Sequence, residues 1–356
     1  MQPTVRAILG GLALIVIAGC SAGASASRPA GATLGPTDAP TLAPHPTEPP
    51  WGHTAPGATA FAGRIAFSHY DEQSAITSIY VVAGTDGTVR RLTQDLIFPN
   101  VGSWSPDGRS LALDRTVCLD AVSRCASIIS IIDVATGSIR DITQPLSGVL
   151  DFHASFSPDG HRLLFSSTRS VNDAEGVNLF TVGIDGSSPV GIPIDATTAD
   201  LAGWSPDGTW IRYSEWSGFE SPRLFEIHPD GSGRRAIDAL AAVAIGHAVW
   251  SPDGSAVAYT ADSALQPVSA TESVTTPEIW ASAPLGAPGR ALVPWPWHGA
   301  APAWSPDGAA IAFVGGPAGV DALCIVGLDG AEPKLVATPG LVPSDTPIAW
   351  TATTGD

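Results

Sequence analysis

Polar side chains that could bind a ligand recur shortly ahead of a series of regularly spaced aromatic residues. They carry carboxylate or amide oxygens, or imidazole nitrogens, which bind divalent cations and polar molecules. The candidates are Asn100, Asp151, His153, Asp200, His247 and Asp345, and His298 holds a similar place. If their strands surround one channel, we expect these side chains to ring its mouth and hold a cation or a polar ligand. The alternative is that they are ordinary solvated residues at the starts of strands.

Five of the aromatic residues begin a repeated motif, Trp-Ser-Pro-Asp-Gly, with Phe in place of Trp in one copy. The copies occupy residues 104–108, 156–160, 204–208, 250–254 and 304–308. Trp350 stands where a sixth copy would begin, and the steps between the aromatic positions are 52, 48, 46, 54 and 46 residues. A repeat of about 40 to 50 residues is typical of the four-stranded blade of a β-propeller.

The Ser-Pro-Asp-Gly part of the motif is typical of a tight turn. Proline suits the second position of a type I turn, aspartate bonds to nearby backbone N–H groups, and glycine adopts the left-handed conformation. The aromatic residue before the turn should be buried between blades, where it removes about 150–250 Å² from water. That burial contributes at most roughly 4–6 kcal/mol per blade. We therefore interpret the motif as a device that forms blades, and not as a ligand site.

The number of half-repeats predicts how the ring closes. Strands that follow a turn begin at residues 65, 111, 163, 210, 257 and 311, and the first of these has no motif ahead of it. Conversely, residues 346–350 match the strand before a turn and have no strand after them. We expect an all-β, six-bladed propeller over residues 61–356, closed by pairing of residues 346–350 with residues 63–68. Closure of this kind removes exposed sheet edges.

The repeat resembles that of the TolB-type propellers, which combine Trp-Ser-Pro-Asp-Gly with a following strand like Ile-Ala-Phe. The resemblance covers about residues 61–350 and implies the propeller fold and a protein-binding role. TolB itself has an α/β domain ahead of its propeller, whereas this chain has a Pro-rich segment there. The resemblance therefore does not carry over TolB's own partner, the peptidoglycan-associated lipoprotein.

The N-terminus has the pattern of an export signal. An apolar run follows Arg6, and Ile17-Ala18-Gly19-Cys20 resembles the lipobox of bacterial lipoproteins, which implies lipidation of Cys20. The alternative is a plain secretory signal with an incidental cysteine. Residues 21–60 are rich in Pro, Ala, Thr and Ser and contain few large apolar side chains. We expect residues 1–20 to be the signal peptide and residues 21–60 to be a disordered tether.

The net charge excludes one class of partner, and the positions of the cysteines indicate a disulfide. The formal net charge is −17 and the sequence pI is about 4.6, which is unsuited to a nucleic acid backbone. Cys118 and Cys125 enclose a short loop, and in an exported protein we expect them to form a disulfide. Cys324 lies in an apolar run and is expected to be a buried core residue.

These observations predict a lipid-anchored binding or scaffold module outside the cytoplasm. It would face the periplasm or the cell exterior, bind a protein partner at the cell envelope and require no cofactor. One alternative is a hydrolase or lactonase that acts at the channel mouth with a bound divalent cation such as Ca²⁺, as six-bladed lactonases do. Another is a sensor of a small ligand. No residue is assigned a catalytic role.

Overall fold

Six four-stranded antiparallel sheets and one two-stranded sheet make up the described part of the chain. The computed structural model describes residues 60–94, 96–119, 125–171, 176–194, 198–216, 223–237, 245–262, 266–267, 273–274, 277–293, 297–317, 321–336, 338, 341–344 and 346–352. The predicted signal peptide with Cys20, and the predicted tether apart from Ala60, lie outside these residues. Within these ranges, no helix has the length and apolar character needed to cross a membrane.

Each four-stranded sheet is one blade, and its strands follow one another from the centre of the ring outwards. Blade 1 comprises β26 (Ala349–Thr351), β1 (Arg64–Asp71), β2 (Ile76–Ala83) and β3 (Val89–Arg91). Blade 2 comprises β4 (Ile97–Trp104), β5 (Ser110–Cys118), β6 (Cys125–Asp133) and β7 (Ile139–Asp141). Blade 3 comprises β8 (Asp151–Phe156), β9 (Arg162–Ser167), β10 (Asn178–Gly183) and β11 (Val190–Gly191).

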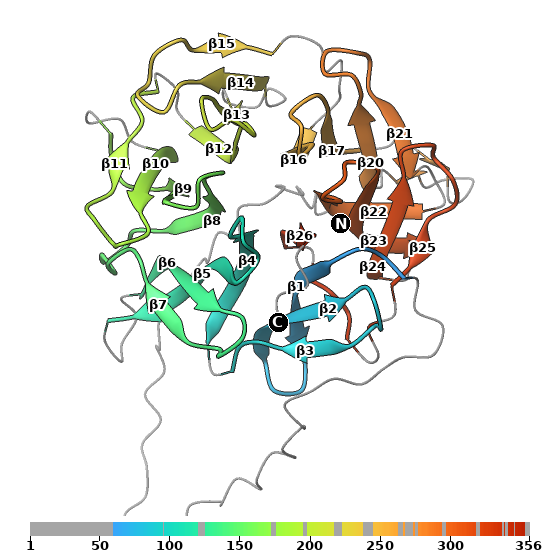
Figure 1. Cartoon of the computed structure of the whole chain (residues 1–356), viewed down its shortest axis with the longest axis horizontal. Helices are drawn as coiled ribbons and strands as arrows, with labels where there is room; N and C mark the ends of the chain where they lie inside the picture. Colours follow the sequence, from blue (N-terminus) through green and yellow to red (C-terminus); the bar gives the residue numbers. More distant parts are fainter. Residues whose placement is uncertain are drawn as a thin grey trace, which may run out of the picture. The chain divides into compact units, whose positions relative to one another are not determined.

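The remaining blades repeat this order. Blade 4 comprises β12 (Thr198–Trp204), β13 (Ile211–Trp216), β14 (Arg223–Ile227) and β15 (Arg235–Ala236). Blade 5 comprises β16 (Ile245–Trp250), β17 (Val257–Asp262), β20 (Pro277–Ser282) and β21 (Arg290–Val293). Blade 6 comprises β22 (Trp297–Trp304), β23 (Ala310–Pro317), β24 (Ala322–Gly327) and β25 (Lys334–Leu335). The sheets stand around a ring, with the strands that carry the aromatic residues innermost (Figure 1).

The ring closes as the half-repeats predict. β26, near the C-terminus, pairs antiparallel with β1, so that Arg64 lies opposite Thr351 and Ala66 opposite Ala349. The chain just before β26 follows the same edge of β1, since Ser344 N donates to Ser68 O at 2.8 Å. Blade 1 is thus built from both ends of the propeller, and the prediction of an all-β, six-bladed ring is confirmed.

Differences in repeat length come from the outer parts of two blades. The longest step, of 54 residues, spans blade 5, where the hairpin of β18 (Gln266–Pro267) and β19 (Ser273–Val274) is inserted between β17 and β20. The step of 52 residues spans blade 2, where β5 and β6 are each nine residues long. The innermost strands and their turns are unaffected by these additions.

The Ser-Pro-Asp-Gly turn is held by its own side chains. In the first copy, Ser105 Oγ donates to Asp107 Oδ1 at 2.6 Å, and the same carboxylate oxygen accepts from Arg109 N at 3.0 Å. Gly108 N donates to Ser105 O at 2.8 Å, and Gly108 has φ +67°, a left-handed conformation that favours glycine. The other four copies repeat the bond between serine and aspartate, so the predicted turn chemistry is confirmed.

The tryptophans join neighbouring blades through hydrogen bonds as well as through apolar contact. Three indole N–H groups each donate to the carbonyl oxygen that immediately precedes the aromatic residue of the previous blade. These bonds are Trp104 to Ala349 at 3.1 Å, Trp204 to Ser155 at 3.3 Å and Trp304 to Val249 at 3.0 Å. Phe156 has no N–H group on its ring, and there its backbone N donates to Ser103 Oγ at 2.7 Å.

Replacing Trp304 by Phe should test the contribution of one such bond. Trp304 is buried, and Phe would retain most of its apolar contact while leaving the Val249 carbonyl without its indole donor. We expect the free energy of unfolding to fall by about 1–2 kcal/mol. Chemical denaturation measures this change. A loss below about 0.5 kcal/mol would show that the bond between blades contributes little.

The cysteines occupy two different environments. A disulfide joins Cys118 at the end of β5 to Cys125 at the start of β6, where the two residues lie opposite each other in the hairpin. Cys324 is a free thiol, fully buried in β24. Burial raises the pKa of the Cys324 thiol to about 12, so this cysteine is a core residue without the character of a nucleophile.

Candidate functional site

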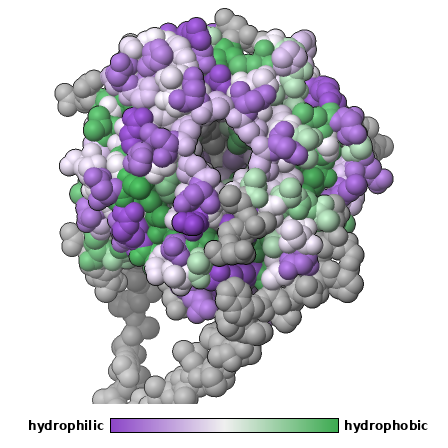
Figure 2. Space-filling view, in the orientation of Figure 1, coloured by the Kyte–Doolittle hydropathy of each residue, from purple (hydrophilic) through white to green (hydrophobic). Residues whose placement is uncertain are grey.

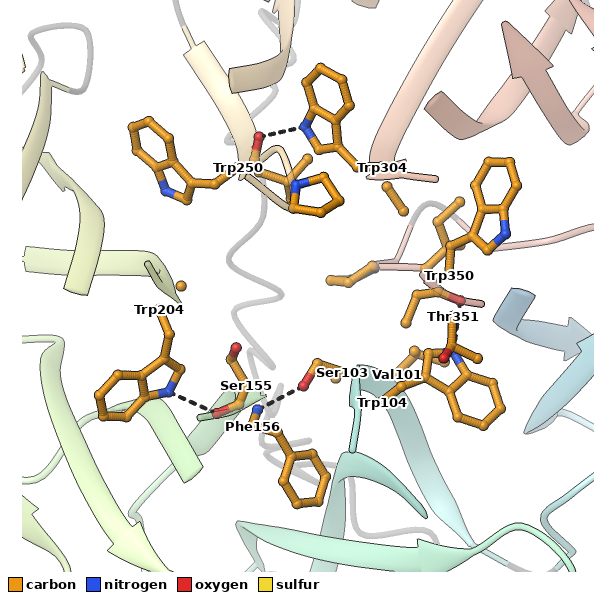
Figure 3. Close-up of a pocket in the computed structure, with 18 of the residues that line it drawn as sticks. Val101, Ser103, Trp104, Ser155, Phe156, Trp204, Trp250, Trp304, Trp350 and Thr351 are labelled. Atoms are coloured by element: carbon orange, nitrogen blue, oxygen red, sulfur yellow. Dashed lines mark hydrogen bonds between the residues drawn. The ribbon is translucent and has the colours of Figure 1, made fainter. Parts of the chain in front are cut away.

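A cavity of about 570 Å³ lies at the end of the channel where the Ser-Pro-Asp-Gly turns meet. The aromatic residues of all six blades line it: Trp104, Phe156, Trp204, Trp250, Trp304 and Trp350. They surround the cavity in chain order (Figure 3). Pro106, Pro158, Pro252 and Pro306 of the turns also contribute to its lining. The motif that we interpreted as a device that forms blades therefore also contributes to the wall of this cavity.

Adjacent turns touch one another around the opening. A Cβ atom built on Gly160 would lie 3.5 Å from the Pro106 ring, and one on Gly208 would lie 3.7 Å from the Pro158 ring. The next two pairs of neighbouring turns are similarly close: Gly254 lies beside Pro206, and Gly308 lies beside Pro252. The five turns hence form one continuous arc, and blade 1, which has no such turn, completes the circle. Figure 2 shows the central opening of the ring with hydrophilic residues along much of its border.

Irregularities in the innermost strands bring two histidines into the cavity. The register of β8 against β9 shifts between Phe152 and Ser155, and the corresponding shift in β16 lies between Gly246 and Val249. Within these shifts, His153 has φ +56° and His247 has φ +43°. A positive φ is unfavourable for these residues, and bulges of this kind re-aim a side chain. Both histidines line the inner end of the cavity.

His153 stands between two buried carboxylates from the neighbouring blades. Its Nδ1 lies 2.9 Å from Asp200 Oδ1, and its backbone N donates to Asp114 Oδ1 at 3.2 Å. Ser166 Oγ also donates to Asp200 Oδ1 at 2.7 Å, and Asn100 Nδ2 donates to Asp114 Oδ2 at 2.9 Å. This cluster spans blades 2, 3 and 4, and we call these five residues the channel cluster.

The protonation of the channel cluster departs from that of isolated side chains. Burial raises the pKa of Asp114 to about 6, although His153 and Asn100 oppose that rise. Burial disfavours the charged form of His153 too, but the nearby Asp200 and Asp114 carboxylates outweigh it and raise the pKa of His153. Burial and the adjacent His153 lower the pKa of His247 to about 4. His153 thus keeps its proton to a higher pH than an ordinary histidine, whereas His247 is neutral near pH 7.

Replacing His247 by Asn should remove a loss of stability that acid causes in the natural protein. The folded pKa of His247 is about 4 and the ordinary histidine pKa is 6.5, so the unfolded chain binds the proton first as the pH falls. From pH 7 to pH 4, this one group should lower the free energy of unfolding by on the order of 2–3 kcal/mol. Denaturation at both pH values measures the difference, with His161→Asn, at an exposed position, as the control. Equal acid sensitivity of the natural protein and His247→Asn would contradict this assignment.

The other candidates predicted from the sequence fall elsewhere. Asp151 is 1% exposed, and its carboxylate accepts from Arg169 and Ser167, so it forms a buried ion pair apart from the channel cluster. His298 Nε2 pairs with Asp321 Oδ1 at 2.7 Å on the exposed surface. Asp345 lies outside the described residues. Within the described part of the chain, no three His, Cys, Asp or Glu side chains converge to hold a metal ion.

Sequence reasoning missed Asp114 and Ser166, because they lie on the second strands, β5 and β9, and not ahead of an aromatic residue. A signal was present, since Asp114 follows the apolar run Leu111-Ala112-Leu113 at the place where Ser68 follows Ile65-Ala66-Phe67. A charged residue directly after the apolar run of a strand, in one repeat only, indicates that this repeat holds a buried polar site.

Several solved structures have a similar fold. TolB from Acinetobacter baumannii gives a TM-score of 0.61 at 18% identity, over 81% of this chain and 66% of that chain. A putative TolB from Agrobacterium tumefaciens gives 0.54 at 16% identity, over 77% and 88%. Hydrazine synthase from Kuenenia stuttgartiensis gives 0.59 at 12% identity, over 82% and 47%. No protein-family model and no curated protein matches the sequence. The chain therefore has the fold of the TolB propellers and spans about two thirds of the Acinetobacter baumannii protein.

Proposed function

We propose that this TolB-type propeller is an extracytoplasmic binding module that receives a segment of a protein partner in its central cavity. The cavity carries this proposal. Its volume of about 570 Å³ falls within the range of sites that enclose compact ligands, and its wall is mostly apolar with few polar groups. The proline rings and the innermost strands, which the buried tryptophans hold in place, form a preformed surface, and this reduces the entropy lost on binding. A peptide segment suits such a site because its side chains can enter while its backbone stays near the rim.

Blocking the cavity should abolish partner binding without unfolding the ring. Ser155 is half-buried on the innermost strand β8, and its side chain is oriented towards the centre of the cavity (Figure 3). Ser155→Arg would place a long charged side chain there. Val190, on the outer strand β11 of the same blade, is 64% exposed, so Val190→Arg is a matched control.

The test is a pull-down from solubilised membranes with the full-length chain as bait. We expect the same partner with the natural chain and Val190→Arg, and its loss with Ser155→Arg. Circular dichroism melting curves check that both variants are folded. A partner that Ser155→Arg retains would place the binding surface outside the cavity and overturn the proposal.

The proposal includes export and a lipid anchor at Cys20. Its support is the sequence of residues 1–20, with an apolar run ending in Ile17-Ala18-Gly19-Cys20. The anchor would hold the propeller at a membrane, with residues 21–60 as the tether. In detergent phase separation, the natural chain should enter the detergent phase and Cys20→Ser should remain in the aqueous phase. Aqueous partitioning of the natural chain from its own host would refute the anchor.

A second candidate function is binding or hydrolysis of a small ligand at the inner end of the cavity. The observation that favours it is the channel cluster, because groups with shifted pKa values in a concave site are frequent in active sites. A bound divalent cation such as Ca²⁺ would belong to this alternative. It predicts an ester- or lactone-hydrolysing activity that chelation or His153→Gln removes. An activity that neither treatment changes would exclude the cluster as its site.

A further inference from the structure

We infer that the segment which enters the cavity is basic, with Lys or Arg beside an apolar residue. This inference rests on the proposed function and specifies the chemistry of the partner. It follows from the charges at the rim and at the inner end of the cavity, together with the apolar wall between them.

Each Ser-Pro-Asp-Gly turn places one aspartate beside the rim, next to the residues that line the cavity. All five are exposed: Asp107, Asp159, Asp207, Asp253 and Asp307. Each follows a proline of the turn, and the turns form the continuous arc around the opening described above. Since the serine hydroxyl and a backbone N–H bind one oxygen of each carboxylate, the aspartates cannot swing away from the rim. We call this set the aspartate arc.

The aspartate arc is ionised over the whole physiological range. Hydrogen bonds from the turn lower the pKa of all five carboxyls, to about 2 for Asp207 and Asp253. In Asp107, Asp159 and Asp307, the turn contacts engage only Oδ1. The second oxygen of these carboxylates therefore faces solvent and can accept a hydrogen bond from an ammonium or guanidinium group.

Local cations compensate one part of the arc more than the other. Arg109 lies beside Asp107, and His161 and Arg162 lie beside Asp159, and these groups contribute to the lowered pKa values there. No basic side chain contributes in this way to Asp207, Asp253 or Asp307. Among the described residues, the three carboxylates of blades 4, 5 and 6 are thus less compensated by basic side chains, although Arg212 reaches the carbonyl of Gly254 in the turn of blade 5.

Arginines that reach the turns are engaged in structural contacts. Arg64 donates to Gly108 O at 2.6 Å and stacks over Trp104, and Arg212 donates to Gly254 O at 3.0 Å and stacks over Trp250. These guanidinium groups hold neighbouring blades together at the rim. The contacts named here are made to carbonyl oxygens and indole rings.

The inner end of the cavity has two carboxylates behind one histidine. His153 and His247 line it, Asp114 and Asp200 lie behind His153, and His247 is neutral near pH 7 because its pKa is about 4. Two carboxylates thus accompany the one histidine that they hold, so the inner end does not oppose a cationic side chain. An acidic segment would meet repulsion at the rim, so the site discriminates by charge.

The probe is a random dodecapeptide library on phage, selected against the full-length protein and, in parallel, against Ser155→Arg. We expect the peptides that only the natural protein selects to carry a net positive charge and at least one large apolar residue. A synthetic copy of the leading peptide should then bind about 5- to 20-fold more weakly to the triple variant Asp207→Asn, Asp253→Asn and Asp307→Asn at low salt. Asparagine retains an oxygen that can accept the turn bonds, so the turns should persist.

The matched control removes three charges from the other end of the blades. Asp71, Glu72 and Asp321 are exposed, next to the end of β1 and the start of β24. The triple variant Asp71→Asn, Glu72→Gln and Asp321→Asn should change the affinity less than about twofold. Equal effects of the two triple variants would attribute binding to overall charge and overturn the inference.

The outcomes separate this inference from the proposed function. Neutral or acidic peptides that bind the natural protein but not Ser155→Arg would support the cavity as a binding site and refute the basic segment. An affinity that the triple variant of Asp207, Asp253 and Asp307 leaves unchanged would also refute the basic segment. A library that shows no difference between the natural protein and Ser155→Arg would refute both.

Discussion

A chain that ends at Ser344 should no longer unfold as a single cooperative unit. Truncation removes β26, which supplies the innermost strand of blade 1 and the Ala349 carbonyl that accepts from Trp104. It also removes Trp350, whose indole donates to Ala62 O at 2.7 Å and packs edge-on against Phe61. The edge of β1 would be left without a partner, and an open ring exposes the apolar interface between blades 1 and 2. Differential scanning calorimetry should show a broadened transition or none, and increased aggregation.

Two point variants near the closing strand measure how much single side chains contribute to the stability of the closed ring. Ile348 is 6% exposed and packs in the core between blades 1 and 6, so Ile348→Ala should lower the free energy of unfolding by about 2–4 kcal/mol. Val342 is only six residues away and is 51% exposed, so Val342→Ala should change it by less than about 0.5 kcal/mol. A truncated chain that melts cooperatively at the natural temperature would show that closure contributes little to stability.

Replacing Asp200 by Ala should lower the free energy of unfolding by about 3–5 kcal/mol near pH 6, the usual loss when one partner of a buried ion pair is removed. Asp200 is 6% exposed, and its carboxylate accepts from both His153 and Ser166. Without it, Asp114 is the one carboxylate among the described residues that still raises the pKa of His153, so that pKa should fall. NMR titration of the histidine ring resonances measures that fall directly, and chemical denaturation measures the change in stability.

The loss of stability in Asp200→Ala should depend on pH in a defined direction. Because Asp200 raises the folded pKa of His153, the stabilisation from the pair is complete below the ordinary histidine pKa and is lost as the pH rises through the raised value. The difference between the natural protein and Asp200→Ala should therefore shrink at alkaline pH. Asp141→Ala is the control, because its carboxylate, 43% exposed, pairs with Arg115, and exposed pairs contribute less than about 1 kcal/mol. A His153 pKa that is unchanged in Asp200→Ala would remove the basis for a coupled channel cluster.

Two roles of the Trp-Ser-Pro-Asp-Gly motif are compatible because different groups perform them. The serine, the glycine and one aspartate oxygen close the turn, while the indole rings join neighbouring blades. Four of the proline rings line the opening, and the second carboxylate oxygens of Asp107, Asp159 and Asp307 take no part in the turn bonds, so both are available to a partner. A motif required for folding can in this way impose the same surface chemistry on every blade, and the aspartate arc is one consequence.

The architecture could be predicted from the sequence because its causes are local. Each turn is specified by five consecutive residues, and each strand by a short apolar run, so six repeats could be counted without knowledge of long-range contacts. Ring closure also followed from counting, since an unpaired first strand and an unpaired last strand complete one blade. The pairing of Ala349–Thr351 with Arg64–Ala66 confirms that reasoning.

Only the tertiary structure showed which polar residues meet. His153, Asp200 and Asp114 come from three blades, and they meet because register shifts in the innermost strands redirect side chains by an amount that no local pattern encodes. Asp151, which stands only two positions before His153, is turned instead towards Arg169. The sequence by itself thus determined the blades, their number and their closure, because turn chemistry and strand period act over a few residues. The cavity, its charge and the members of the channel cluster depend on the packing of one blade against the next, and only the closed ring brings them together.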